Sequence, residues 1–136
     1  MSLPLSNFES ACAEKQKIIV SREKKNEHIA INDHDCFVRQ FRIDGYVITD
    51  NIKKCDYLVL NDDNCTAYFI ELKGSDISCA IEQINQTVET LKKDLVDYDK
   101  KLRIVYSGKV NSGTIINWKI KNKNADAGRN TYTDHI

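Results

Sequence analysis

The sequence predicts a single α/β domain, in which an antiparallel sheet is followed by an amphipathic helix and a further buried strand. Three features support this: short apolar runs between turn residues from 36 to 73, apolar residues at helical spacing from 77 to 95, and a buried strand at 102–107. The chain has 136 residues, 41% hydrophobic and 29% charged, which suits one domain spanning 1–136 with a real core.

The first expected element is a helix that begins near Ser6. Ser6 and Glu9 have the spacing of a capping box. In this motif the serine side chain accepts a hydrogen bond from a backbone N–H of the first helical turn, and the acid three residues later accepts one from the serine N–H. Apolar residues that would line one face of this helix are Phe8, Ala11, Cys12, Ile18 and Ile19.

The next segment is expected to form an antiparallel meander. An Asp-Gly pair at 44–45 is a favoured hairpin turn between strands at 36–43 and 46–49. Strands at 55–61 and 66–73 flank a second turn and are apolar on both faces. Strands of that kind are buried on both sides, so we expect layers that cover both faces of the sheet.

A strong helix signal follows, which Ser75 or Asp76 can cap. Its apolar residues recur every three or four positions: Ile77, Ala80, Ile81, Ile84, Val88, Leu91 and Leu95. A buried strand is then expected at 102–107. Residues 114–120 are ambiguous between strand and helix, and the polar segment 122–136 is expected to be loop or a frayed tail.

One polar cluster lies within the apolar strands. A four-residue loop at 62–65 would place Asp56 opposite Glu71, and Lys73 would share their face because strand side chains alternate. Adjacent carboxylates repel, and a divalent cation relieves the repulsion. Mg²⁺ takes one or two carboxylates with waters and substrate phosphate, and a lysine stabilises developing negative charge. These residue types at this spacing suit phosphodiester hydrolysis.

This arrangement resembles the PD-(D/E)xK nuclease superfamily, which includes type II restriction enzymes and Holliday-junction resolvases. The resemblance covers the order of elements from residue 6 to about 107, and in residues only Asp56, Glu71 and Lys73. It implies a restriction-endonuclease-like sandwich, with a central mixed sheet, the element order α-β-β-β-α-β, and flanking helices. The proline of the motif name is absent, since Cys55 precedes Asp56.

By position, the resemblance implies a role for each motif residue. Asp56, Glu71 and the Leu72 carbonyl would bind Mg²⁺ or Mn²⁺, and Lys73 would be the catalytic lysine.

Two further positions follow from the same resemblance. Members often complete the metal site with an acid from the first helix, for which Glu9 or Glu14 is the candidate. The capping box is the competing explanation for Glu9. Several members also place a Gln or Glu on the helix after the motif strand, and here Gln83 has that position. Its competing explanation is a polar residue that borders the core.

A basic and aromatic segment begins at about residue 109 and is expected to contact nucleic acid. Lysines can bind the phosphate backbone and a tryptophan can stack on a base. The candidates are Lys109, Trp118, Lys119, Lys121 and Lys123, and the Lys24-Lys25 pair is expected to bind phosphates as well. A solvated lysine- and asparagine-rich end is the competing interpretation.

The net charge of zero hides an uneven distribution. Residues 54–100 carry five Lys or Arg against ten Asp or Glu, whereas residues 101–136 carry seven against two. Overall neutrality counts against a nucleic-acid partner, but a metal in an acidic site beside a basic tail would offset it.

These features predict a metal-dependent endonuclease that hydrolyses nucleic acid, with DNA as the first candidate. The chain is short, so we expect selectivity to come from a homodimer or from a larger protein partner. Two alternatives stay open. The first is a catalytically inactive nuclease fold that acts as a binding or assembly module. The second is an unrelated α/β domain that acts on a small phosphorylated ligand.

The expected location is cytoplasmic, with no membrane contact. The sequence shows no secretion signal, and its apolar runs are too short to cross a bilayer. None of the five cysteines has the C-x-x-C spacing typical of zinc sites, so reduced thiols are expected.

Overall fold

The computed structural model describes residues 4–136. The elements in chain order are η1 (Leu5–Asn7), β1 (Ile18–Glu23), β2 (Asn26–Ile31), β3 (Val38–Arg42), β4 (Tyr57–Asn61), β5 (Thr66–Lys73), α1 (Ile77–Thr90), β6 (Asp99–Tyr106), α2 (Ser112–Lys121), β7 (Ala125–Arg129) and β8 (Thr131–His135). Neither α1 nor α2 has the length and apolar character that a membrane-crossing helix needs.

The strands form two sheets. The larger has the order β3-β4-β5-β6-β7, in which β3, β4 and β5 are antiparallel while β6 and β7 run parallel to β5. The smaller has the order β1-β2-β8, in which β1 is antiparallel and β8 parallel to β2. The predicted α/β class is confirmed, and the second sheet was not expected.

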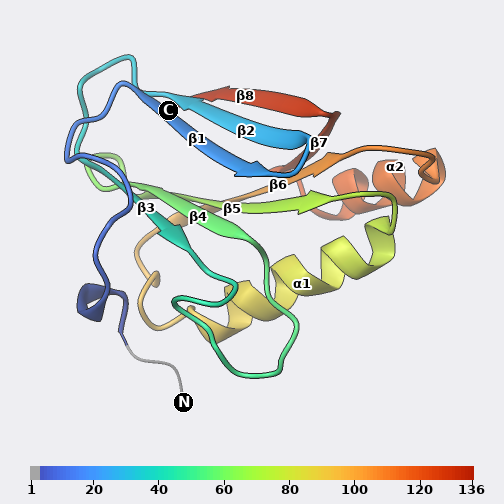
Figure 1. The fold of residues 1–136 in the computed structure, drawn as a ribbon, viewed down its shortest axis with the longest axis horizontal. Helices are drawn as coiled ribbons and strands as arrows, with labels where there is room; N and C mark the ends of the chain where they lie inside the picture. The colour runs from blue at the N-terminus through green and yellow to red at the C-terminus, as the bar shows by residue number, and fades with distance from the viewer. Residues whose placement is uncertain (1–3) are drawn as a thin grey trace.

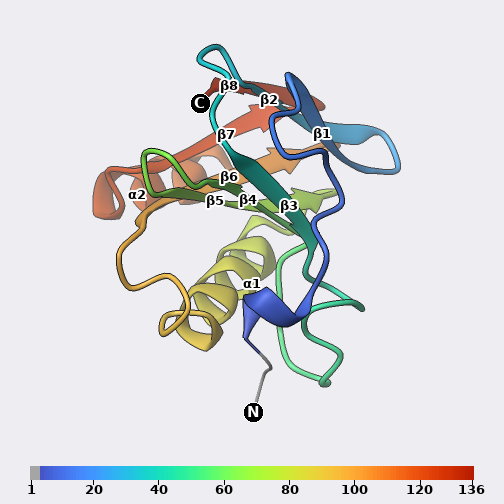
Figure 2. The ribbon, with the colours of Figure 1, turned by 90° about the vertical axis from the view of Figure 1, so that its left-hand side faces the viewer.

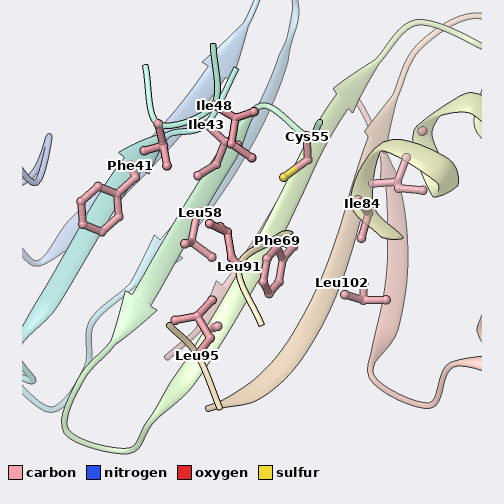
Figure 3. Close-up of a cluster of buried hydrophobic side chains, with 14 of the residues drawn as sticks. Phe41, Ile43, Ile48, Cys55, Leu58, Phe69, Ile84, Leu91, Leu95 and Leu102 are labelled. Carbon is pink, nitrogen blue, oxygen red and sulfur yellow. The ribbon is translucent and has the colours of Figure 1, made fainter. Parts of the chain in front are cut away.

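Figure 1 shows the layers, with the small sheet on one face of the large sheet and α1 on the other; Figure 2 shows the same arrangement from the side. The apolar cluster next to α1 includes Leu58, Phe69 and Leu91 (Figure 3). A second cluster, which includes Val59 and Tyr68, fills the space between the sheets. Both faces are covered, as predicted, but β1, β2 and β8 cover one of them in place of a helix.

The pairing of β4 with β5 has the predicted register. Asn61 lies opposite Thr66 and Tyr57 opposite Ile70, which leaves the four-residue turn 62–65 between the strands. Because side chains alternate along a strand, this register fixes which residues face α1 and which face the small sheet.

The predicted first helix is wrong. Ser6 lies within the short 3-10 turn η1, which has no side-chain cap, and Glu9 follows that turn. The run Ile18-Ile19-Val20 forms β1 instead, because consecutive β-branched residues favour a strand. Its pairing with β2 buries Ile19 between the two sheets.

The expected 46–49 strand also does not form. Gly45, with a φ of 87°, turns the chain, and Val47 and Ile48 pack into the core from the turn itself. The neighbour of β3 is β4, with Val38 opposite Asn61. Burial of the apolar turn residues therefore replaces strand pairing in this segment.

The main helix prediction is confirmed. The Asp76 side chain caps α1 by accepting a hydrogen bond from the Cys79 N–H at 3.0 Å. The helix ends at Thr90, and the last two predicted helical residues, Leu91 and Leu95, are buried in the turns that follow. The predicted strand after it is β6, which begins at Asp99.

The expectation of a loop or frayed tail at 122–136 is wrong, because this segment forms β7 and β8, while the ambiguous segment before it forms α2. A buried ionic cluster joins β8 to β2 of its own sheet and to β6 of the large sheet. Asp134 accepts hydrogen bonds from Arg103 at 2.8 and 3.0 Å, and its Oδ2 lies 2.8 Å from Nε2 of the fully buried His28.

We expect Asp134→Ala to lower the free energy of unfolding by about 3 kcal/mol, because it leaves a buried guanidinium without its acidic partner. Denaturant unfolding measures this change. Asp33→Ala is the matched control, since it removes the exposed pair of Asp33 with His135, and should cost less than about 1 kcal/mol. Equal losses in the two variants would contradict a structural role for the cluster of Asp134, Arg103 and His28.

Candidate active site

A pocket lies where β5 ends, between the β1–β2 turn and α1. Figure 1 shows this turn, the end of β5 and the start of α1 on the same side of the molecule, at the right. The lining includes Asp56, Glu71, Leu72, Lys73 and Gln83, so the structure brings together five residues that the sequence singled out. Its volume of about 510 Å³ is that of a small-ligand site.

Asp56 and Glu71 form a buried acidic pair at the ends of β4 and β5. The Asp56 N–H donates to the Ile70 carbonyl at 3.1 Å, which continues the strand register and places Asp56 opposite Glu71. Glu71 is only 2% exposed, and its Oε1 has no hydrogen-bond partner in the part of the chain that the structure describes. Asp56 Oδ2 accepts a hydrogen bond from the Leu72 N–H at 2.9 Å.

Burial disfavours the ionised form of both acids. It raises the pKa of Glu71 to about 9; the charge of Asp56 adds to this shift, and Lys73 opposes it. Burial also raises the pKa of Asp56, with the hydrogen bond from Leu72 acting in the opposite direction. The metal-free pair therefore holds a proton at neutral pH, and a divalent cation would displace it.

The oxygen atoms around this pair suit Mg²⁺. The carbonyl of Leu72 points to the same strand edge as its N–H, which is the edge where Asp56 lies. Among residues 4–136, no group of three or more His, Cys, Asp or Glu side chains is arranged to hold a metal. The two carboxylates and this carbonyl would therefore need water and substrate to complete the coordination of a hard cation.

The two predicted first-helix acids lie elsewhere. Neither Glu9 nor Glu14 lines the pocket, because the helix that would have presented them does not form. The further acids that line it are Glu23, at the end of β1, and Asp44, in the turn after β3. Glu23 was not among the predicted site residues, because the β1–β2 hairpin that carries it was not predicted.

Gln83 projects from α1 into the pocket lining, as its predicted role requires. Its Nε2 donates to the Lys54 carbonyl at 3.2 Å, and its Oε1 lies 3.6 Å from the Cys79 sulfur. The side chain is therefore held by the loop before β4, with its amide at the pocket edge.

The predicted basic tail does not reach the pocket. Four of its predicted contact residues are exposed and none of them lines the pocket: Lys109, Lys119, Lys121 and Lys123. Trp118 is only 4% exposed, because α2 turns it into the cluster next to α1. The prediction that Trp118 stacks on a base is therefore corrected, since its ring is a core side chain.

The Lys24-Lys25 pair does line the pocket, at the tip of the β1–β2 hairpin. Within the described residues, neither these lysines nor Lys73 has a carboxylate within ion-pair distance. Arg42, the remaining basic residue of the lining, pairs with Glu23 at 3.0 Å. The pocket thus holds a buried acidic pair and three unpaired lysines.

The chain matches no protein-family model, and comparisons with curated proteins and with solved structures find no similar protein.

We expect Glu71→Gln to raise the free energy of unfolding of the metal-free protein at pH 8 by about 1–3 kcal/mol, because the raised pKa of the buried Glu71 makes folding at pH 8 require proton uptake, which glutamine does not need. The folded-state pKa of Glu71, about 9, lies above its ordinary value of 4.5. Its contribution to stability is therefore complete below pH 4.5 and is lost as pH rises toward 9.

Urea unfolding between pH 5 and 9 in EDTA measures this effect. The gain from Glu71→Gln should grow with pH, whereas the exposed-site control Glu89→Gln should run parallel to wild type. A constant gap between Glu71→Gln and wild type across the range would contradict a raised pKa for Glu71.

Proposed function

We propose that this protein is a metal-dependent nuclease that hydrolyses phosphodiester bonds in nucleic acid, with DNA as the first candidate. The observation that carries the proposal is the charge arrangement of the pocket. A buried acidic pair and three lysines line the same cavity without forming ion pairs with one another. Such a site suits a ligand that carries both signs of charge, as a metal-bound phosphate does.

The topology supports a restriction-endonuclease-like fold for this site. The order β3-β4-β5-α1-β6, with a meander followed by a helix and a parallel strand, is the β-β-β-α-β part of the expected arrangement. The first helix of that arrangement is absent from the described residues, and the β1-β2-β8 sheet covers the face that a helix was expected to cover.

The chemistry follows from the residue types at the end of β5. Asp56, Glu71 and the Leu72 carbonyl would bind Mg²⁺ or Mn²⁺, which when bound polarises a phosphodiester and lowers the pKa of water. Lys73 donates a hydrogen bond to the attacking water or to a phosphate oxygen and stabilises the negative charge of the transition state. The attacking water gives up a proton to solvent as its oxygen bonds to phosphorus, one phosphorus–oxygen ester bond breaks, and the leaving oxygen takes up a proton from solvent.

A second candidate is a catalytically inactive nuclease fold that acts as a binding or assembly module. The observation that favours it is the small number of acidic ligands, since the described residues offer no three-acid group. In that case Asp56, Glu71 and Lys73 would be a remnant polar cluster that does not hold a metal.

Cleavage of circular duplex, linear duplex and single-stranded DNA in Mn²⁺ or Mg²⁺ tests hydrolysis directly. We expect Glu71→Gln and Lys73→Gln each to lower the rate by at least about 100-fold, because each removes a group that acts in the transition state. Lys92→Gln, an exposed substitution after the C-terminal end of α1, should cleave as wild type does. Equal rates in wild type and Glu71→Gln would assign the activity to a contaminant.

Thermal unfolding with added Mn²⁺ tests the metal site separately. A bound metal stabilises the folded state by mass action, by about 2.7 kcal/mol at one hundred times the dissociation constant. We expect a concentration-dependent rise in Tm for wild type and none for Glu71→Gln. Absence of both stabilisation and cleavage would select the second candidate, whereas stabilisation without cleavage would support the metal site and reject hydrolysis of the DNA substrates used.

A further inference from the structure

A buried asparagine connects the β1–β2 hairpin to the backbone of the proposed catalytic lysine. Asn26 is the first residue of β2 and follows the two tip lysines directly. It is only 5% exposed, and its Nδ2 donates to the Lys73 carbonyl at 2.9 Å. The other polar atom of its side chain, Oδ1, is buried without a partner among residues 4–136, although Asn26 lines the pocket.

This contact joins the two sheets beside the pocket, where the Arg42–Glu23 ion pair and the hydrogen bond from the Tyr57 hydroxyl to the Arg22 carbonyl also connect them. The Lys73 carbonyl also accepts a hydrogen bond from the Ser107 N–H at 3.2 Å. The start of β2 and the residue after β6 therefore both hold the backbone of Lys73. The orientation of the Asn26 side-chain amide is fixed, because a 180° rotation would place its Oδ1 against the Lys73 carbonyl oxygen, and two acceptors cannot form a hydrogen bond. Asn26 is therefore placed to determine where Lys73 lies relative to the hairpin tip.

The tip itself shows backbone strain. Lys24 has a φ of 54°, in the left-handed region that favours glycine or asparagine. A lysine at this position costs stability, and such strain is concentrated at functional sites. The pair Lys24-Lys25 is also exposed and free of carboxylate partners in the described structure, so its charges are available to a ligand.

We propose that the β1–β2 hairpin is the substrate-binding arm of the site. Lys24 and Lys25 bind phosphates of the nucleic-acid strand next to the bond that is cut, and Asn26 is a positioning residue that fixes Lys73 relative to this arm. The proposal rests on the proposed nuclease function. Because lysines contact phosphates as point charges, the arm binds without sequence preference.

Oligonucleotide binding in EDTA tests the arm without turnover. The probes are fluorescein-labelled single-stranded and duplex 20-mers, followed by anisotropy at several salt concentrations. The double variant Lys24→Gly with Lys25→Gln should weaken binding about 10-fold and reduce the slope of log K against log salt by about 0.7–0.9 per lysine. Lys24→Gly alone should raise Tm because it relieves the backbone strain, so weaker binding could not be assigned to misfolding.

The matched control for the arm is Lys92→Gln with Lys93→Gln, a second adjacent pair of exposed lysines. It should leave both the affinity and the salt slope unchanged. Equal losses of affinity in the two double variants would overturn the role of the arm, because binding would then depend on overall charge alone. No loss of affinity in the tip variant would overturn it as well.

Asn26→Asp and Asn26→Ala test the positioning role. Both should lower kcat at least about 10-fold, the effect expected when a catalytic group is misplaced, and leave KM and oligonucleotide affinity within about 2-fold because the tip lysines remain. The control is Asn32→Ala, which removes a buried asparagine at the opposite end of β2, where it anchors the Gln16 and Cys36 carbonyls. An equal loss of kcat in Asn32→Ala would show that Asn26 acts only through general hairpin stability, and would overturn its role.

The two proposals fail in different ways. Cleavage that depends on Glu71, with tip variants that bind and cleave as wild type does, would retain the nuclease and reject the arm. Oligonucleotide binding that depends on the tip, with no cleavage by wild type, would reject the nuclease and retain the arm as the contact surface of a binding module. Absence of both oligonucleotide binding and cleavage in wild type would reject both.

Discussion

The pairing of β4 with β5 in one register holds the rest of the molecule in place. With Asn61 opposite Thr66, Phe69 packs toward α1 while Tyr68 packs toward the small sheet. A slip of one residue would exchange these faces and would also separate Asp56 from Glu71. Core packing on both faces therefore enforces the position of the acidic pair, and the precision of the site comes from apolar residues that do not contact it.

The pocket works against the stability that these clusters provide. Two acids lie side by side, Glu71 has a buried oxygen without a partner, and Lys24 has a strained backbone. Each of these features costs free energy in the metal-free protein. They lie together at one end of the molecule, whereas the buried charges at the other side of the sheet, Arg103 and Asp134, are fully paired. Unmatched polar groups gathered in one cavity are typical of a site that binds its missing partners from solution.

Much of the central architecture could be predicted from the sequence, because its signals are local. The β4–β5 pair follows from a four-residue turn between apolar runs, and α1 follows from helical spacing with a cap at Asp76. The site residues on these elements could be placed together for the same reason. Strand β8 of the small sheet could not be predicted, because its sequence is polar and gives no local signal. Its pairing is decided by the distant contacts of Asp134 with His28 and Arg103. Glu23 and Asn26 were missed together with the hairpin that carries them.

The chain passes from the large sheet to the small one within a single residue, Asn130, which lies between β7 and β8 and has a φ of 63°. The parallel neighbour of β2 is thus separated from it by nearly the whole described chain, since Glu27 pairs with Thr131. A contact so distant in sequence carries a loop-closure entropy that the meander and α1, built from nearer contacts, do not carry. The pocket therefore combines an acidic pair set by nearby strands with a hairpin tip whose sheet is completed by the strand pairing most distant in sequence among the described residues.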